Sequence, residues 1–253
     1  MSTAQHTITV SSSLPSLSGR RIAVRVDGEG DPLLLLNGMT RPLLSWDPFT
    51  KELHGRRVIS FDTPGVGGSP TPLRPLSIPE LGRVAMAVLD EVGVDDADVL
   101  GYSHGGAVAQ QLAHDVPDRV RRLILVATSC GVGATPGTGG AILRGLGGPV
   151  EGNAWPIPDL LGMFWQSLAV SAWSSIPFLG SIKAPTLVVC GSRDRVVPPS
   201  NSKILARRIP GAALQMLPGG HDVQRGESAA ELAGLVEAFL SAGRTAEPLR
   251  ICG

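Results

Sequence analysis

One serine stands at the junction between an apolar, strand-like run and a small-residue, helix-like run. The segment "GYSHG", residues 101–105, fits the pattern Gly-x-Ser-x-Gly and is followed by "GAVAQQLAHD". In this context the pattern predicts a sharp strand-to-helix turn, because a Cβ at either flanking glycine would collide across the bend. The turn leaves the hydroxyl of Ser103 open to a substrate, so we predict that Ser103 is a nucleophile.

A serine hydroxyl is a poor nucleophile unless a neighbouring base removes its proton. The chain has five histidines, His6, His54, His104, His114 and His221. His221, in the segment "LPGGHDV", follows the last strand-like run. The side chain of His104, directly after the serine, would point away from the hydroxyl. We therefore predict that His221 is the general base and acid.

The histidine needs a carboxylate that orients its ring and stabilises its charged form. Asp194, in "TLVVCGSRDRVVPP", follows a strand-like run and lies between Ser103 and His221 in the chain, the order that accompanies this type of turn. Asp222 competes only through its adjacency to the histidine, since neighbouring side chains diverge. Asp62 precedes the serine and is expected to brace the loop "TPGVGGS". We predict that Asp194 is the acid.

Two backbone N–H groups are predicted to bind the oxyanion that forms when serine attacks a carbonyl. One belongs to His104, the residue after the nucleophile, at the beginning of the predicted helix. The other is expected in the turn after the run "LLLLN", and we place it on Met39.

Short apolar runs recur along the chain and must position these residues. Their continuous apolarity predicts strands that are buried on both faces of a parallel sheet, whereas the first two, more polar runs are expected to be outer, antiparallel strands. Helices are predicted within 77–94, where Ser77 and Glu80 form a capping box, and over 104–115, 199–209 and 227–241. The pattern predicts an α/β fold with a mostly parallel, doubly wound sheet of about eight strands. The runs are 7–10, 21–26, 33–37, 58–62, 99–103, 123–128, 186–191 and 214–218.

Residues 131–181 interrupt this alternation with a glycine-rich stretch followed by an aromatic one. The insertion is too long for an ordinary connection, so we predict a cap or lid over a core formed by 1–130 and 182–253. The alternative is a helical elaboration that completes the core. The aromatic side chains expected to contact substrate are Trp155, Phe164, Trp165 and Trp173.

Composition excludes several classes of partner. Lys and Arg total 22 and Asp and Glu total 22, so no basic field indicates a nucleic acid partner. The glycine-rich segments 65–69 and 131–140 match no phosphate-binding pattern. Cys130, Cys190 and Cys252 show neither a disulfide framework nor metal-ligand spacing, and the first two are expected to be buried thiols. We expect no cofactor and no metal.

The first 21 residues lack the basic start and apolar stretch of a signal peptide, and no run reaches the length of a membrane span. We therefore expect the protein to be cytoplasmic and to have no integral membrane segment.

Six segments together resemble the α/β-hydrolase superfamily, and most closely its intracellular medium-chain-length polyhydroxyalkanoate depolymerases. They are "LLLLNGMT", "FDTPGVGGSPTP", "GYSHGGAVAQQLAHDVPDRVRRLILVAT", "FWQSLAVSAWSS", "APTLVVCGSRDRVVP" and "RRIPGAALQMLPGGHD". By this resemblance Ser103, Asp194 and His221 match the charge-relay triad. Two features depart from the depolymerases, which usually carry Trp at the position of His104 and have a longer cap.

The resemblance implies a serine ester hydrolase that acts on medium-chain 3-hydroxyacyl esters or on poly(3-hydroxyalkanoate). An aromatic cap of low charge is consistent with an apolar acyl chain. A small-ester carboxylesterase, a lactonase or a thioesterase without polymer activity is the alternative within the same class, since one fold hosts many reactions. A non-catalytic binding protein is the alternative outside it, and would normally have lost one of the three residues.

Overall fold

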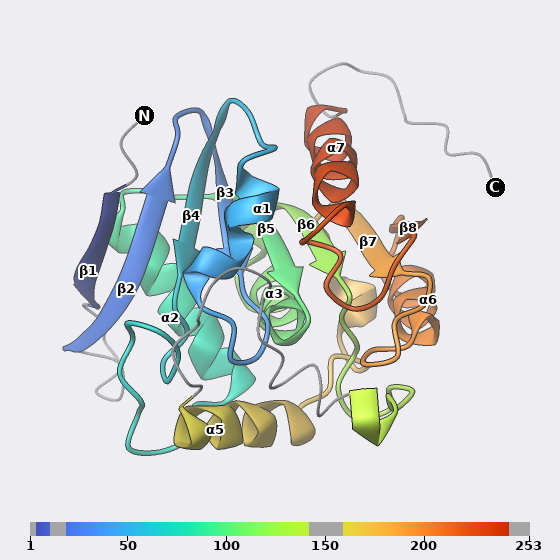
Figure 1. Ribbon diagram of the computed structural model, residues 1–253, viewed down its shortest axis with the longest axis horizontal. Helices are drawn as coiled ribbons and strands as arrows, with labels where there is room; N and C mark the ends of the chain where they lie inside the picture. Colours follow the sequence, from blue (N-terminus) through green and yellow to red (C-terminus); the bar gives the residue numbers. More distant parts are fainter. Residues whose placement is uncertain (1–3, 11–18, 142–158, 243–253) are drawn as a thin grey trace.

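The computed structural model describes residues 4–10, 19–141 and 159–242, in which one eight-stranded sheet forms the centre of the molecule (Figure 1). Its order is β1-β2-β4-β3-β5-β6-β7-β8. The strands are β1 (Ala4–Val10), β2 (Arg20–Asp27), β3 (Asp31–Leu36), β4 (Arg56–Phe61), β5 (Ala97–Tyr102), β6 (Val120–Val126), β7 (Thr186–Gly191) and β8 (Ala213–Leu217).

The pairing of these strands follows their composition. Neighbours from β4 to β8 pair in parallel, whereas β1 with β2 and β2 with β4 are antiparallel. Every residue of β5 and β7 is buried, as expected for strands covered on both faces. The predicted fold class, the eight runs and the two antiparallel outer strands are confirmed.

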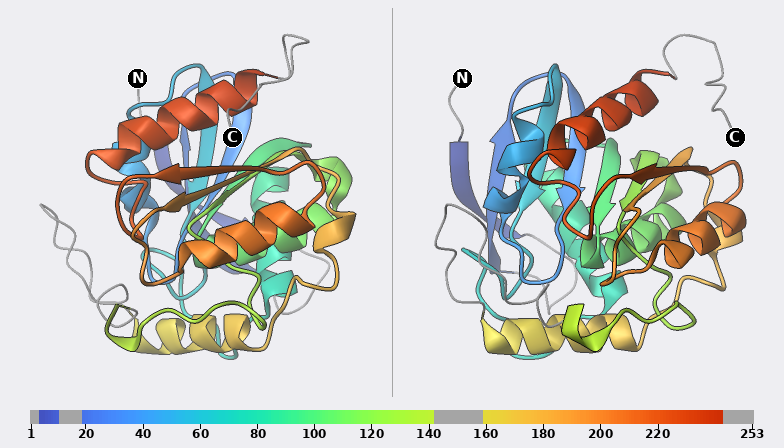
Figure 2. Two further views of the ribbon diagram at one scale, coloured as in Figure 1. Left: turned by 90° about the vertical axis from the view of Figure 1, so that its right-hand side faces the viewer. Right: turned by 45° about the vertical axis from the view of Figure 1, so that its right-hand side comes forward.

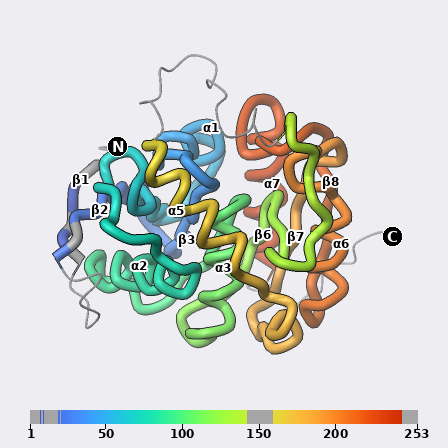
Figure 3. Tube along the Cα trace, turned by 90° about the horizontal axis from the view of Figure 1, so that it is seen from below, coloured from blue at the N-terminus to red at the C-terminus, as the bar shows by residue number. Residues whose placement is uncertain are grey.

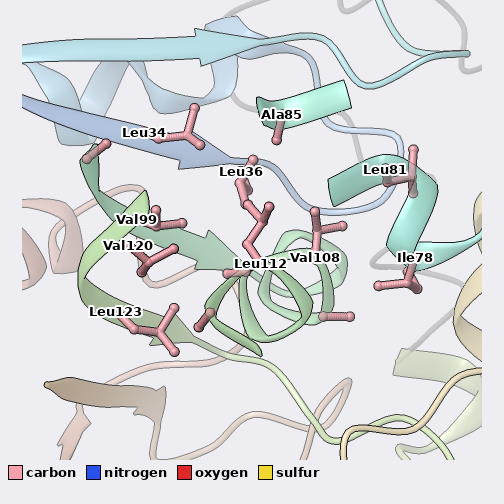
Figure 4. Close-up of a cluster of buried hydrophobic side chains, with 14 of the residues drawn as sticks. Leu34, Leu36, Ile78, Leu81, Ala85, Val99, Val108, Leu112, Val120 and Leu123 are labelled. Atoms are coloured by element: carbon pink, nitrogen blue, oxygen red, sulfur yellow. The ribbon is translucent and has the colours of Figure 1, made fainter. Parts of the chain in front are cut away.

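Alternate side chains of each central strand enter two separate cores. Leu34 and Leu36 belong to a core that also contains residues of α2 (Ile78–Glu91) and α3 (His104–Asp115), which Figure 4 shows, and of α6 (Pro199–Arg208). Leu33 and Leu35 pack on the other face against α1 (Asp47–Thr50) and α7 (Ser228–Ser241) (Figure 2). Helices on both faces make the sheet doubly wound.

The parallel strands end at one edge of the sheet, and helix α5 (Leu160–Ser171) crosses that edge (Figures 1 and 3). Its N-cap is Asp159, whose Oδ1 accepts hydrogen bonds from the N–H groups of Leu161 and Gly162 at 2.9 and 3.0 Å. Three short 3-10 turns are also described, η1 (Leu43–Trp46), η2 (Pro117–Arg119) and η3 (Leu179–Ser181). Among the described helices none is long and apolar enough to cross a bilayer.

Helix α3 approaches the end of β3 so closely that only glycine fits at its start. A Cβ on Gly105 would lie 2.7 Å from the carbonyl oxygen of Asn37 and would also overlap the backbone of Leu36. A Cβ on Gly101 would lie 2.5 Å from the carbonyl oxygen of Gly105. These approaches fix where α3 begins relative to the sheet.

We expect Gly105→Ala to lower the free energy of unfolding by about 1–3 kcal/mol, because the added methyl group meets backbone atoms that cannot rotate away. Urea denaturation followed by circular dichroism measures the change. The matched control is Gly234→Ala in α7, at an exposed site where a Cβ meets nothing within 4 Å. That variant should gain about 0.5–1 kcal/mol, and equal stability of the two variants would contradict the packing argument.

Candidate active site

Ser103 occupies the sharp turn between β5 and α3 in a conformation that L-residues rarely adopt. Its φ is 51° and its ψ is −117°. Such a conformation costs of order 1–3 kcal/mol and persists only where the surroundings impose it. Here the N–H of Ser103 donates to the carbonyl of Val126 at 2.9 Å, and Thr128 Oγ1 donates to the carbonyl of Ser103 at 2.7 Å. The neighbouring strand thus holds both sides of the turn.

The structure brings Ser103, His221 and Asp194 into one hydrogen-bonded chain. Ser103 Oγ lies 3.0 Å from His221 Nε2, and His221 Nδ1 lies 2.8 Å from Asp194 Oδ2. The side chains of Asp194 and His221 are 0% and 11% exposed. An imidazole that contacts a hydroxyl on one side and a buried carboxylate on the other can move a proton to and from the serine.

The carboxylate of Asp194 is satisfied on its other oxygen by backbone groups. Oδ1 accepts hydrogen bonds from the N–H groups of Val196 and Val197 at 2.8 and 2.9 Å. The loop that carries Asp194 is tied to the histidine loop, because the N–H of Arg193 donates to the carbonyl of Gly219 at 2.8 Å. These bonds fix the carboxylate before any substrate arrives.

Asp222, the neighbouring carboxylate, faces a different partner. Its Oδ1 accepts a hydrogen bond from the hydroxyl of Tyr102 at 2.6 Å and lies 3.5 Å from Arg41 Nη2. Burial and the Asp222 carboxylate raise the pKa of Tyr102 well above its ordinary value, so the phenol stays protonated and donates. Sequence reasoning did not single out Tyr102, although it directly precedes the nucleophile.

Asp62 braces a loop, as predicted. Its carboxylate accepts hydrogen bonds from the N–H groups of Gly68, at 2.8 Å, and Leu43, at 2.6 Å. Burial raises the pKa of Asp62 above its ordinary value, while the two N–H groups and Arg25 oppose that shift. The side chain therefore organises the segment after β4 and does not contact the histidine.

A cavity of about 670 Å³ opens beside Ser103 and His221. Met39 and His104 line it. Small and apolar residues dominate the other walls, including Ala107, Val132, Ala134, Val170, Val196 and Val197. No cluster of three metal-ligating side chains occurs among the residues described.

The side chain of His104 is buried beside this cavity. Burial lowers the pKa of His104 to about 4, although a hydrogen bond to the backbone of Gln166 in α5 opposes the shift. The ring is therefore neutral at physiological pH. Its position agrees with the prediction that this histidine does not serve as the base.

None of the described aromatic residues that we expected to contact substrate lines this cavity. Phe164 is 57% exposed on the outer face of α5, since the helical period directs Ser167 and Val170 inward instead. Trp165 donates to the carbonyl of Pro72 at 3.2 Å. Trp173 is buried in the core and donates to Gln111 Oε1 at 2.8 Å. Trp155 lies outside the described residues.

Comparison with known proteins identifies the family. Residues 31–140 match the α/β-hydrolase fold family and residues 87–230 match the serine hydrolase (FSH1) family. A poly(3-hydroxyalkanoate) depolymerase from Ectopseudomonas oleovorans is 36% identical over 220 residues, which cover 75% of this chain and 77% of the relative. The chain belongs to the α/β-hydrolase superfamily.

Solved α/β-hydrolases share the architecture over most of their length. A hydrolase from Pseudomonas aeruginosa PA01 matches with a TM-score of 0.80 and 28% identity, covering 94% of this chain and 98% of that one. Est816, an N-acyl homoserine lactone degrading enzyme, matches with a TM-score of 0.72 and 30% identity, covering 87% of this chain and 97% of that one.

The two carboxylates near the histidine of this α/β-hydrolase should differ in their effect on turnover. We expect Asp194→Asn to lower kcat on a soluble ester by about 10³–10⁴-fold, because an amide cannot stabilise the imidazolium or hold the correct tautomer. Asp222→Asn keeps an oxygen that can accept from Tyr102 and should cost less than about tenfold. A larger loss in Asp222→Asn, measured by steady-state kinetics, would contradict the assignment of the acid.

The buried imidazole of His104 should make folding stability fall in acid. Its pKa is lowered from 6.5 to about 4 by burial, so between these values the unfolded state binds the extra proton. The free energy of unfolding is therefore unaffected by this imidazole above pH 6.5. It decreases by on the order of 1.4 kcal/mol per pH unit as the pH falls from 6.5 towards 4.

Urea denaturation at pH 7, 6, 5 and 4.5 measures this slope. His104→Gln should flatten the dependence, whereas His54→Gln, which removes an exposed histidine, should leave it unchanged. Equal slopes in the native chain and His104→Gln would show that the imidazole is not buried as described.

Proposed function

We propose that this α/β-hydrolase cleaves carboxylic esters through an acyl-enzyme formed on Ser103. The observation that supports this most directly is the hydrogen-bonded chain from Ser103 Oγ to His221, at 3.0 Å, and from His221 to Asp194, at 2.8 Å. The three residues come from the ends of β5, β7 and β8, which the fold gathers at one edge of the sheet.

In the first half-reaction Ser103 Oγ attacks the ester carbonyl while His221 Nε2 takes the hydroxyl proton. Asp194 stabilises the imidazolium that results. The N–H groups of Met39 and His104 donate to the oxyanion, and His221 then passes its proton to the departing alkoxide. Water repeats the sequence on the acyl-enzyme, which releases the carboxylic acid and restores the serine.

We assign medium-chain 3-hydroxyacyl esters, or poly(3-hydroxyalkanoate), as the substrate class. The relative that is 36% identical is named a poly(3-hydroxyalkanoate) depolymerase. The mostly small and apolar walls of the cavity suit an aliphatic acyl chain. In this proposal residues 131–181 are a cap, because Val132, Ala134 and Val170 form part of the cavity wall.

A lactonase or small-ester esterase without polymer activity is the second candidate. Its support is the match at 30% identity to an N-acyl homoserine lactone degrading enzyme, which spans 87% of this chain. Ser103, His221 and Asp194 would open a lactone by the same steps. Because a lactone is a cyclic ester, the alkoxide that leaves the carbonyl stays joined to the acyl group through the rest of the ring.

A chain-length series of nitrophenyl esters, run beside a suspension of medium-chain polyester, separates the two candidates. We expect kcat/KM to rise from acetate to octanoate by at least tenfold, because each buried CH₂ contributes about 0.8 kcal/mol, and we expect the suspension to clear. Preference for acetate, or for an acyl lactone, with no clearing would support the second candidate.

Ser103→Ala and a fluorophosphonate probe are the controls for the mechanism. The probe should label the native chain once, at Ser103, and the variant not at all. Turnover that persists in the variant would exclude the acyl-enzyme for every substrate in the series.

A further inference from the structure

One turn of α5 contacts the loop that carries Met39. The N–H of Thr40 donates to Gln166 Oε1 at 2.9 Å, and Ser167 Oγ lies 3.4 Å from Met39 Sδ. The side chain of Gln166 is buried, with the residue only 4% exposed. A helix from the 131–181 segment therefore supplies the acceptor for a backbone group directly beside a proposed oxyanion donor.

The loop itself is a strained β-turn over residues 38–41. The N–H of Arg41 donates to the carbonyl of Gly38 at 3.1 Å, which closes the turn. Thr40, its third residue, has φ of 60°, whereas Met39 has no positive φ. This combination belongs to the type II turn, which favours glycine at the third position. Threonine there is costly, because its branched side chain disfavours positive φ.

Types I and II differ mainly by a flip of the central peptide, here the one between Met39 and Thr40. In the type I form Thr40 would have its preferred negative φ, but its N–H would turn away from Gln166 Oε1. The hydrogen bond to Gln166 thus offsets the strain and selects the type II form. The proposed oxyanion donor, the N–H of Met39, belongs to the Gly38–Met39 peptide of the same turn, so the hydrogen bond to Gln166 holds the turn that carries this donor.

The second proposed donor has a contact with the same residue. His104, whose N–H begins α3, has its buried ring beside the backbone of Gln166. Gln166 is therefore next to both donors while touching neither the serine nor the histidine of the hydrogen-bonded chain.

We propose that Gln166 is a positioning residue that holds the Met39 oxyanion donor in place by fixing the type II turn at residues 38–41. This inference rests on the proposed function, because the donors matter only if an oxyanion forms. It makes α5 part of the catalytic apparatus as well as a wall of the cavity. Gln166 acts through Thr40 and does not contact the substrate.

Gln166→Met removes the acceptor while nearly conserving volume, and Gln166→Ala removes it without added bulk. Both should lower kcat on nitrophenyl octanoate by about 10–100-fold, less than the loss of a whole oxyanion donor, with KM within about threefold. Gln166→Glu keeps an oxygen at the same place and should retain more activity than either variant.

Thr40→Gly provides the decisive rescue. Glycine adopts positive φ without strain, so the double variant Gln166→Met with Thr40→Gly should regain at least fivefold in kcat over Gln166→Met alone. If Gln166 served only to stabilise the fold, adding Thr40→Gly would not restore kcat. Urea denaturation of each variant checks that the compared proteins are folded.

Three results would overturn the inference: kcat within twofold of the native value in both acceptor-less variants, a loss confined to KM, or no rescue by Thr40→Gly. Ser103→Ala is assayed alongside. Ser103-dependent turnover that is insensitive to Gln166 removes this inference alone, whereas turnover that is independent of Ser103 removes the proposed function as well.

Discussion

The positive φ of Ser103 is the constraint on which the rest of the site depends. With φ of 51° at Ser103, the chain passes from the end of β5 to the beginning of α3 within one residue. The helix must then pass close to its neighbours, which is why a Cβ at Gly101 or Gly105 would overlap backbone atoms. The carbonyl of Val126 on the adjacent strand holds the turn. The strain is local, but the parallel sheet is what sustains it.

Continuous apolar runs and the serine motif were enough to predict the fold and the residues that the structure brings together. A run such as "TLVVCG" is continuously apolar, which favours a strand covered on both faces, so its strand character could be predicted from the run itself. His221 and Asp194 could be chosen because parallel strands present their following loops at one edge. The roles of these residues stay predictions, although the distances between them agree with those roles.

Contacts of the inserted segment could not be predicted in the same way. Composition alone does not tell whether an aromatic residue on a helix lines a cavity, packs in a core or lies on an exposed face. Phe164 is on the outer face and Trp173 is in the core because of how α5 and the following residues settle on the sheet. Gln166 and Tyr102 were missed for a related reason, since their partners are 126 and 120 residues away in the chain.

The distance in sequence between Ser103 and His221, 118 residues, has a consequence for the order in which the molecule is completed. The strained turn is encoded early, but its histidine follows β8, the last strand of the described sheet. During synthesis the nascent chain therefore contains the serine well before it contains the histidine that we propose as its base. Non-local pairings of this kind form late in folding. In the proposed mechanism the serine would become reactive only once β8 has docked, so unfinished chains would not attack esters around them.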